Sequence, residues 1–235
     1  MQRYFALRKE NDKFILEDGD IHHIKNVMRM KNNEKIEVVF DKTLYLCNIV
    51  LEPNLEVRID KIMDNKINNN LKVVLIVPVL KEQKMDFILQ KSTELGVSSI
   101  IPIITERTIV KINDNEKKKI DRWTRIVKEA SEQCKRIDVP NIENVKKIED
   151  LIFDDGVKYV CSTVENVKNI KNVMYLTTNY DKMYIVVGPE GGLTNMEEQK
   201  LNELGFMSIS LGNRIMRVET VPLFVLSILN YEMME

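Results

Sequence analysis

The chain has 235 residues, of which 44% are hydrophobic and 30% charged, and its formal net charge is −1 at pH 7. This length allows one large domain or two small ones with a real core. Near neutrality excludes a uniformly basic nucleic-acid-binding protein, although a local basic face would suffice for RNA. The longest apolar runs, 73–80 and 221–229, are far shorter than the roughly 18 residues of a membrane span, and we expect no membrane partner.

Three cysteines, Cys47, Cys134 and Cys161, are widely spaced and form no CxxC pair. This pattern indicates reduced thiols and a cytoplasmic protein. Only His22 and His23 could join them as ligands, so we expect no metal site.

Residues 1–64 contain short runs of strand-forming residues between turns. The runs at 35–40, 44–51 and 55–62 predict a small, mostly β module, which we expect to be a barrel. One helix is predicted at 20–29, where apolar residues share a face. Its histidines, His22 and His23, fit surface or capping positions better than catalysis. The last residue of this helix, Arg29, could contact phosphate or form an exposed salt bridge.

The polar, turn-forming segment 65–70 predicts a domain boundary, so we expect domains at 1–70 and 71–235. Beyond it, strands alternate with helices, which predicts a mainly parallel sheet covered on both faces. The predicted strands are 72–79, 99–104, 157–162, 183–187 and 208–211. The predicted helices are 81–96, 116–138, the segment from Thr194 to Gly205 that opens with a capping box, and 221–231.

Two of these helices have notable surfaces. The helix at 116–138 carries a basic face, which is either solvated or in contact with phosphate. The helix at 221–231 is apolar nearly all round, which is typical of a core element or of half a subunit interface.

Two glycine-containing bends follow two of the strands. Residues 188–192 read GPEGG, and residues 211–220 read LGNRIMRVET. Glycine lets a ligand approach the backbone closely and lets amides point at it. The first bend matches neither GxGxxG nor GxxxxGK[ST], and Glu190 would repel a phosphate, so a neutral base, an amino-acid end or a cation fits better. Taken alone, this bend is also consistent with a structural turn.

Together, the two bends resemble the RNA methyltransferases of the SPOUT superfamily, in particular the RsmE-type enzymes that methylate N3 of a small-subunit uridine. The family's GPEGG loop stands at 188–192, and its LGxRILRxETA segment stands at 211–221. The likeness continues along the whole chain at 3–5, 23–29, Lys84, Met85, 90–97, Trp123, Ile126, Ala130, Glu132, Gln133, Arg136, Val139 and Pro140.

The resemblance implies an α/β fold in which a PUA-like β-barrel, an RNA-binding module, precedes a SPOUT-type trefoil-knot domain. It implies S-adenosylmethionine bent against both bends, a homodimer whose partner helps to build the site, and small-subunit (16S) ribosomal RNA or the assembled 30S subunit as substrate. Val218 stands where threonine is usual in the family, so a hydroxyl contact would be lost there. Met216 replaces leucine, and Val221-Pro222 replaces small residues. Asn33 replaces a common glycine, which a left-handed turn allows.

We predict that Arg217 stabilises a uridine anion, with Glu219 orienting it or accepting the proton through water; the alternative is a structural ion pair between them. The residues predicted to hold the cofactor are Thr163, Val187, Gly188, Pro189, Glu190, Gly191, Gly192, Leu211, Gly212, Ile215, Met216 and Thr220. The residues predicted to contact RNA are Arg3, Arg29, Lys81, Arg107 and Arg136.

Three other functions remain open. The chain could be a non-catalytic RNA-binding or ribosome-assembly protein that kept the fold. It could be a nucleotide-phosphate enzyme, against which Glu190 and the missing lysine argue. It could also be a SPOUT methyltransferase that acts on a different RNA position.

Overall fold

The computed structural model describes residues 1–64, 71–110, 115–164, 168–173 and 180–233. The chain divides into two compact units, Met1–Asn68 with Lys128–Val139 and Asn69–Val127 with Pro140–Glu235. The predicted boundary at 65–70 lies outside the described residues. Because the division falls within helix α3 (Glu116–Gln133), the end of this helix belongs to the N-terminal unit.

The N-terminal unit contains a six-stranded sheet in the order β1-β4-β5-β6-β3-β2. Its strands are β1 (Arg3–Phe5), β2 (Arg8–Glu10), β3 (Lys13–Ile15), β4 (Lys35–Phe40), β5 (Thr43–Val50) and β6 (Glu56–Met63). Strands β1 and β4 pair in parallel, and the other pairs are antiparallel. The two outermost strands in this order, β1 and β2, are consecutive in the chain. Inward apolar side chains of β1, β3, β4, β5 and β6 form one core.

The predicted helix at 20–29 is present as two short turns. They are α1 (Asp18–His22) and the π-helix η1 (His23–Val27). The ring Nδ1 of His23 lies 2.9 Å from the hydroxyl of Tyr4, which ties η1 to the sheet. As predicted, Asn33 adopts a left-handed conformation, with φ of 67°.

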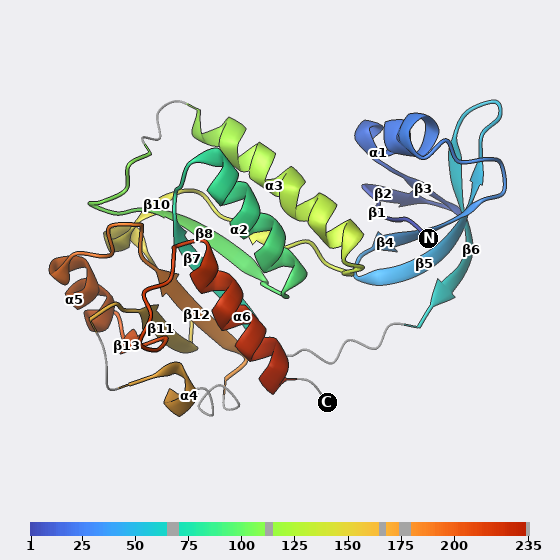
Figure 1. The fold of residues 1–235 in the computed structure, drawn as a ribbon. Coiled ribbons are helices and arrows are strands. Elements are labelled where there is room, and N and C mark those ends of the chain that lie inside the picture. The colour runs from blue at the N-terminus through green and yellow to red at the C-terminus, as the bar shows by residue number, and fades with distance from the viewer. Residues whose placement is uncertain (65–70, 111–114, 165–167, 174–179, 234–235) are drawn as a thin grey trace. The chain divides into compact units, whose positions relative to one another are not determined.

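The C-terminal unit is built on a parallel sheet in the order β10-β8-β7-β12-β11-β13, with β9 beside β8 (Figure 1). Its strands are β7 (Lys72–Pro78), β8 (Ser99–Ile104), β9 (Asn141–Ile142), β10 (Lys146–Lys147), β11 (Val157–Cys161), β12 (Lys182–Val187) and β13 (Met207–Ile209). Strands buried on both faces need apolar side chains throughout, and this explains the continuous apolar runs of β7 and β12.

Helices cover both faces of this sheet. They are α2 (Glu82–Glu94), most of α3, α4 (Ile170–Val173), α5 (Asn195–Glu203) and α6 (Thr220–Glu232), with a 3₁₀ turn, η2 (Ile148–Asp150). Figure 1 shows α2 and α6 side by side, and Asn230 of α6 donates a hydrogen bond to the carbonyl of Leu95 at 2.9 Å. On the other face, Leu201 of α5 and Phe206 pack against Val160 and Val186 of the sheet.

The start of α5 and the end of α3 can each be compared with the sequence-based prediction. The predicted capping box is present, because the Glu197 amide donates to the Thr194 hydroxyl at 3.3 Å and the Glu197 carboxylate accepts from the Thr194 amide at 2.9 Å. Helix α3 ends at Gln133, five residues before the predicted end at 138, and Lys135 takes a left-handed φ of 66°. None of the helices in the described ranges has the length and apolar character needed to cross a bilayer.

Candidate active site

Three segments that follow neighbouring parallel strands meet at one end of the C-terminal sheet. They begin after β11, β12 and β13 and line two adjoining cavities of about 240 and 510 Å³. The residues that both cavities share are Cys161, Ser162, Thr163, Ile215, Met216 and Val221. This is the position at which open α/β sheets bind ligands, as the sequence predicted.

The first bend, 188–192, forms one wall of the larger cavity. The amide of Gly192 donates to the carbonyl of Pro189 at 2.8 Å, and Gly192 takes a left-handed φ of 74°. A Cβ at Gly188 would lie 3.1 Å from the amide nitrogen of Leu193, and one at Gly191 would lie 3.2 Å from Cδ of Arg107. The glycines therefore let the bend close tightly on its own neighbours, and at these three positions only backbone can face the cavity.

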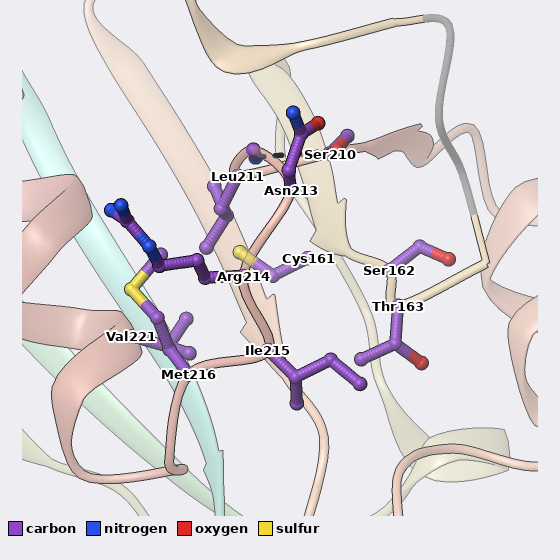
Figure 2. A pocket seen from close by; sticks show the side chains of 11 residues that line it. Cys161, Ser162, Thr163, Ser210, Leu211, Asn213, Arg214, Ile215, Met216 and Val221 are labelled. Carbon is purple, nitrogen blue, oxygen red and sulfur yellow. Dashed lines mark hydrogen bonds between the residues drawn. The ribbon is translucent and has the colours of Figure 1, made fainter.

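In the second bend, 211–220, residues 211–216 line the smaller cavity and residues 215–218 line the larger one. Gly212 takes a left-handed φ of 109°, and the Ile215 side chain is 85% exposed at the edge of both cavities. Figure 2 shows Ser162 and Thr163 on one side of the smaller cavity and Arg214 and Met216 on the other. An exposed aliphatic side chain beside a cavity offers a flat apolar contact for a ligand ring.

Lys84 of α2 joins the two bends by charge. Its Nζ lies 2.8 Å from Oε1 of Glu190 in the first bend and 3.5 Å from Oε2 of Glu219 in the second. The hydrogen bond with Glu190 raises the pKa of Lys84. Burial acts to raise the pKa of Glu190, but the hydrogen bond from Lys84 and the charges of Lys84 and Lys81 outweigh it, so that pKa is lowered.

Arg217 lines the larger cavity and is exposed. Its guanidinium makes no ion pair with Glu219 or with any other carboxylate of the described residues, and Glu219 pairs with Lys84 instead. The structure therefore shows no Arg217–Glu219 ion pair, and the roles of these two residues stay predictions. Oε2 of Glu219 is enclosed and has no hydrogen-bond partner among the described residues.

Most of the predicted cofactor residues line these cavities. They are Thr163, Val187, Gly188, Pro189, Glu190, Gly191, Gly192, Leu211, Gly212, Ile215 and Met216. Thr220 lines neither cavity, because it is the first residue of α6 and faces solvent. Val218, which replaces the family's usual threonine, is 4% exposed and lines the larger cavity with its aliphatic side chain.

Sequence reasoning missed several lining residues. They are Lys84, Cys161, Ser162, Val164, Leu193, Asn195, Glu198, Ser210, Asn213, Arg214, Val218 and Val221. Those after β11 and β13 could have been found by extending the strand-end rule to every predicted parallel strand. Burial raises the pKa of the Cys161 thiol to about 12, so it remains protonated and contributes packing rather than a nucleophile.

The predicted RNA contacts fall into different environments. In the N-terminal unit, Arg3 is 7% exposed, pairs with Glu37 at 2.9 Å, and donates to the carbonyls of Lys135 and Arg136. The side chain of Arg136 pairs with Asp138 at 3.0 Å, whereas Arg29 is exposed in a left-handed conformation. These positions make Arg3 a structural residue and leave Arg29 as the accessible cation of the three.

In the C-terminal unit, Lys81 and Arg107 are exposed. Lys81 is the N-cap residue of α2, and Nη1 of Arg107 donates to the carbonyl of Gly191 at 2.6 Å. Within the ranges that the structure describes, no group of three or more histidine, cysteine or acidic side chains is arranged to hold a metal ion.

Comparison with known proteins gives consistent matches. Residues 67–230 match the family described as RNA methyltransferase domain, and residues 16–60 match RNA methyltransferase PUA domain. The chain is 34% identical to ribosomal RNA small subunit methyltransferase E of Mesomycoplasma hyopneumoniae, over 97% of this chain and 98% of that one. Identity to the protein of the same name from Bacillus subtilis strain 168 is also 34%, over 99% and 97% of the two chains.

Comparison of the fold with solved structures agrees with these sequence matches. A crystal structure of ribosomal RNA small subunit methyltransferase E from Neisseria gonorrhoeae, bound to S-adenosyl methionine, superposes with a TM-score of 0.88 and 31% identity over 99% of this chain and 98% of that one. The α/β unit with a parallel sheet and the preceding PUA-like unit are those of the SPOUT fold class. With two-domain family matches and this identity over nearly its whole length, the chain belongs to the RsmE-type ribosomal RNA methyltransferases of the SPOUT superfamily.

Proposed function

We propose that the protein transfers a methyl group from S-adenosylmethionine to N3 of a uridine in small-subunit (16S) ribosomal RNA. The observation that carries this is that the 188–192 bend and residues 215–218 of the 211–220 bend line the same cavity, with Arg217 among its lining residues. The names of the relatives and the bound S-adenosyl methionine of the Neisseria gonorrhoeae structure support the same reaction class.

The residues present fit this cofactor. Both bends present glycine backbone to the cavities. The larger cavity, of about 510 Å³, is in the size range of small-ligand sites. Glu190 places a negative charge beside it. The predicted lining residues of the two bends would hold the cofactor, with Thr163 between them. When bound, S-adenosylmethionine supplies an electrophilic methyl group that leaves sulfur as N3 attacks it, with S-adenosylhomocysteine as product.

The protein's own groups act on the uridine. Uracil N3 lies on the base-pairing edge, so the target must be unpaired or flipped out. As N3 loses its imide proton, negative charge develops on the uracil, and the unpaired guanidinium of Arg217 at the cavity would stabilise it. Glu219, whose Oε2 has no hydrogen-bond partner among the described residues, would accept the proton through water.

RNA contact is proposed for exposed cations of both units. Arg29 in the N-terminal unit and Lys81 and Arg107 in the C-terminal unit are accessible. We assign residues 1–70 to RNA binding and residues 71–235 to methyl transfer. Phosphate contacts of this kind weaken as salt rises, so binding to 16S RNA fragments should be salt-dependent. A cytoplasmic location follows from a ribosomal substrate.

A homodimer is proposed from α6. Phe224 and Tyr231 are 36% and 75% exposed, and Ile228 between them is partly exposed, so one side of this apolar helix forms a stripe facing outward. A second copy of the chain would cover this stripe and help to complete the site.

One experiment tests the reaction. The protein is incubated with S-adenosylmethionine and either free 16S ribosomal RNA or assembled 30S subunits lacking the modification, and the digested nucleosides are identified by mass spectrometry. We expect N3-methyluridine. Methylation of another nucleotide or atom would show a SPOUT enzyme with a different target. Absence of both product and cofactor binding by calorimetry would favour a non-catalytic assembly protein.

A further inference from the structure

One ammonium group, that of Lys84, forms ion pairs with a carboxylate of each bend of the site. Lys84 lies in the first turn of α2 and lines the larger cavity, and it is far in sequence from both carboxylates, 106 residues from Glu190 and 135 from Glu219. Its Nζ is 2.8 Å from Glu190 and 3.5 Å from Glu219. No other ion pair of these two carboxylates is found among the described residues, so the three side chains form one bridge between the bends.

The carboxylates that Lys84 joins belong to different parts of the site. Glu190 is the central residue of the 188–192 bend, whose backbone lines the cavity. Glu219 is the N-cap residue of α6 and stands two residues after Arg217, whose carbonyl accepts hydrogen bonds from Thr220 and Val221 at 2.9 and 3.2 Å. The position of Glu219 therefore constrains the backbone that carries Arg217.

The bridge is asymmetric. Glu190 is 39% exposed and can be solvated, but Glu219 is 19% exposed, and its Oε2 has no hydrogen-bond partner among the described residues. The positive charge at 3.5 Å is thus the main compensation for an enclosed carboxylate oxygen. Removing one member of such a pair leaves an uncompensated charge, and the local backbone then shifts to reach solvent.

We infer that Lys84 is a positioning residue for methyl transfer: its single ammonium group holds the cofactor bend, through Glu190, and the Arg217 segment, through Glu219, in a fixed relation. The inference rests on the proposed function, because it assigns the two bends to cofactor and uridine. Lys84 acts through the carboxylates, and its effect should therefore fall on the transfer step more than on cofactor affinity. A displacement of about 1 Å at such a site is enough to slow transfer by about 100-fold.

The test compares Lys84→Met, Lys84→Arg and the matched control Lys91→Met in the full chain. Lys91 lies on the same helix, is 35% exposed against 34% for Lys84, and pairs with Glu94 at 2.8 Å. At saturating S-adenosylmethionine, Lys84→Met should lower the single-turnover rate about 10- to 100-fold while the cofactor dissociation constant changes less than about threefold. Lys84→Arg should restore most of the rate, and Lys91→Met should match the wild type.

A double-mutant cycle separates the route through Glu219 from a direct role. If Lys84 acts through Glu219, Lys84→Met combined with Glu219→Gln should transfer no more slowly than Glu219→Gln alone. Additive losses would mean that Lys84 acts by a route that does not pass through Glu219, and a wild-type rate in Lys84→Met would mean that it has no role. Either result overturns the inference while leaving the proposed function intact.

Amide hydrogen exchange provides a readout that does not need activity. Lys84→Met should raise exchange in both 188–193 and 217–220, whereas Lys91→Met should raise it in neither. Unchanged protection in both segments overturns the bridge even if the wild type proves to methylate nothing. A wild type that transfers no methyl group would instead count against the proposed function. If Lys84→Met still exchanged faster than the wild type in both segments, the bridge itself would stand.

Discussion

Nη1 of Arg107 donates a hydrogen bond to the backbone carbonyl of Gly191 at 2.6 Å, and the side-chain carbons of Arg107 lie against the position where Gly191 lacks a Cβ. A residue that the sequence assigned to RNA thus supports the 188–192 bend, which we propose binds the cofactor. A second link runs in parallel, because the amide of Glu106 donates to the Glu197 carboxylate at 2.7 Å, next to the capping box of α5. The loop after β8 therefore contacts the end of this bend at Gly191 and the first turn of α5 at Glu197.

Replacing Arg107 with alanine should weaken cofactor binding. Loss of a charge-assisted hydrogen bond on an exposed side chain corresponds to about 1 kcal/mol, or a roughly fivefold rise in the dissociation constant for S-adenosylmethionine. Isothermal calorimetry measures it, and Arg125→Ala, on the exposed side of α3, is the control. Unchanged affinity in Arg107→Ala would return this residue to a role in RNA binding alone.

Replacing Arg217 with alanine should slow the chemical step. Removal of one preorganised donor to a developing anion costs about 100- to 1,000-fold in the single-turnover rate, and cofactor affinity should stay within about threefold. Arg217→Lys, which keeps the charge but not the planar group, should recover part of the rate. A normal rate in Arg217→Ala with normal cofactor affinity would show that the assignment is wrong.

Replacing Glu132 with glutamine should alter how stability depends on pH. Burial, with the negative charge of Asp20, raises the pKa of Glu132 from 4.5 to about 7, although Lys128 opposes this. The folded state then keeps a proton that the unfolded chain has released, so the free energy of unfolding falls as pH rises from about 4.5 to about 7. The loss should be about 2 to 3 kcal/mol.

Urea denaturation at pH 5 and pH 8, followed by circular dichroism, measures this dependence. Glu132→Gln should flatten it and should be more stable than the wild type at pH 8. Glu129→Gln, an exposed neighbour on the same helix, should retain most of the wild-type slope, because its charge is the smallest of the causes that shift the pKa of Glu132. An unchanged slope in Glu132→Gln would mean that other groups set the pH dependence.

Replacing Tyr231 with glutamate should break the proposed dimer. A charge placed in an apolar interface is left desolvated and unpaired, which costs several kcal/mol and shifts the chain towards monomer. Sedimentation equilibrium measures the association, and Ile152→Glu, at a position 87% exposed away from α6, should associate like the wild type. A monomeric wild type, or an unaffected Tyr231→Glu variant, would exclude this face as the interface.

Sequence alone determined the elements whose cause is local. The apolar runs predicted β7, β8 and β12, because a strand buried on both faces must be apolar along its length. The Thr194–Glu197 capping box predicted the start of α5, because its hydrogen bonds span three residues. The pairing of the two bends was also readable, since strands of one parallel sheet bring their carboxyl ends to the same edge.

Only the tertiary structure decided which groups the charged side chains contact. Arg3 looked like a surface cation, but folding places it beside Glu37 and the carbonyls of residues 135 and 136, where it becomes structural. The sequence marks Lys84 only as a position of family likeness, yet folding makes it join Glu190 to Glu219. These outcomes depend on contacts between residues far apart in sequence, and the direction in which a long charged side chain points is set by the partners that folding brings to it.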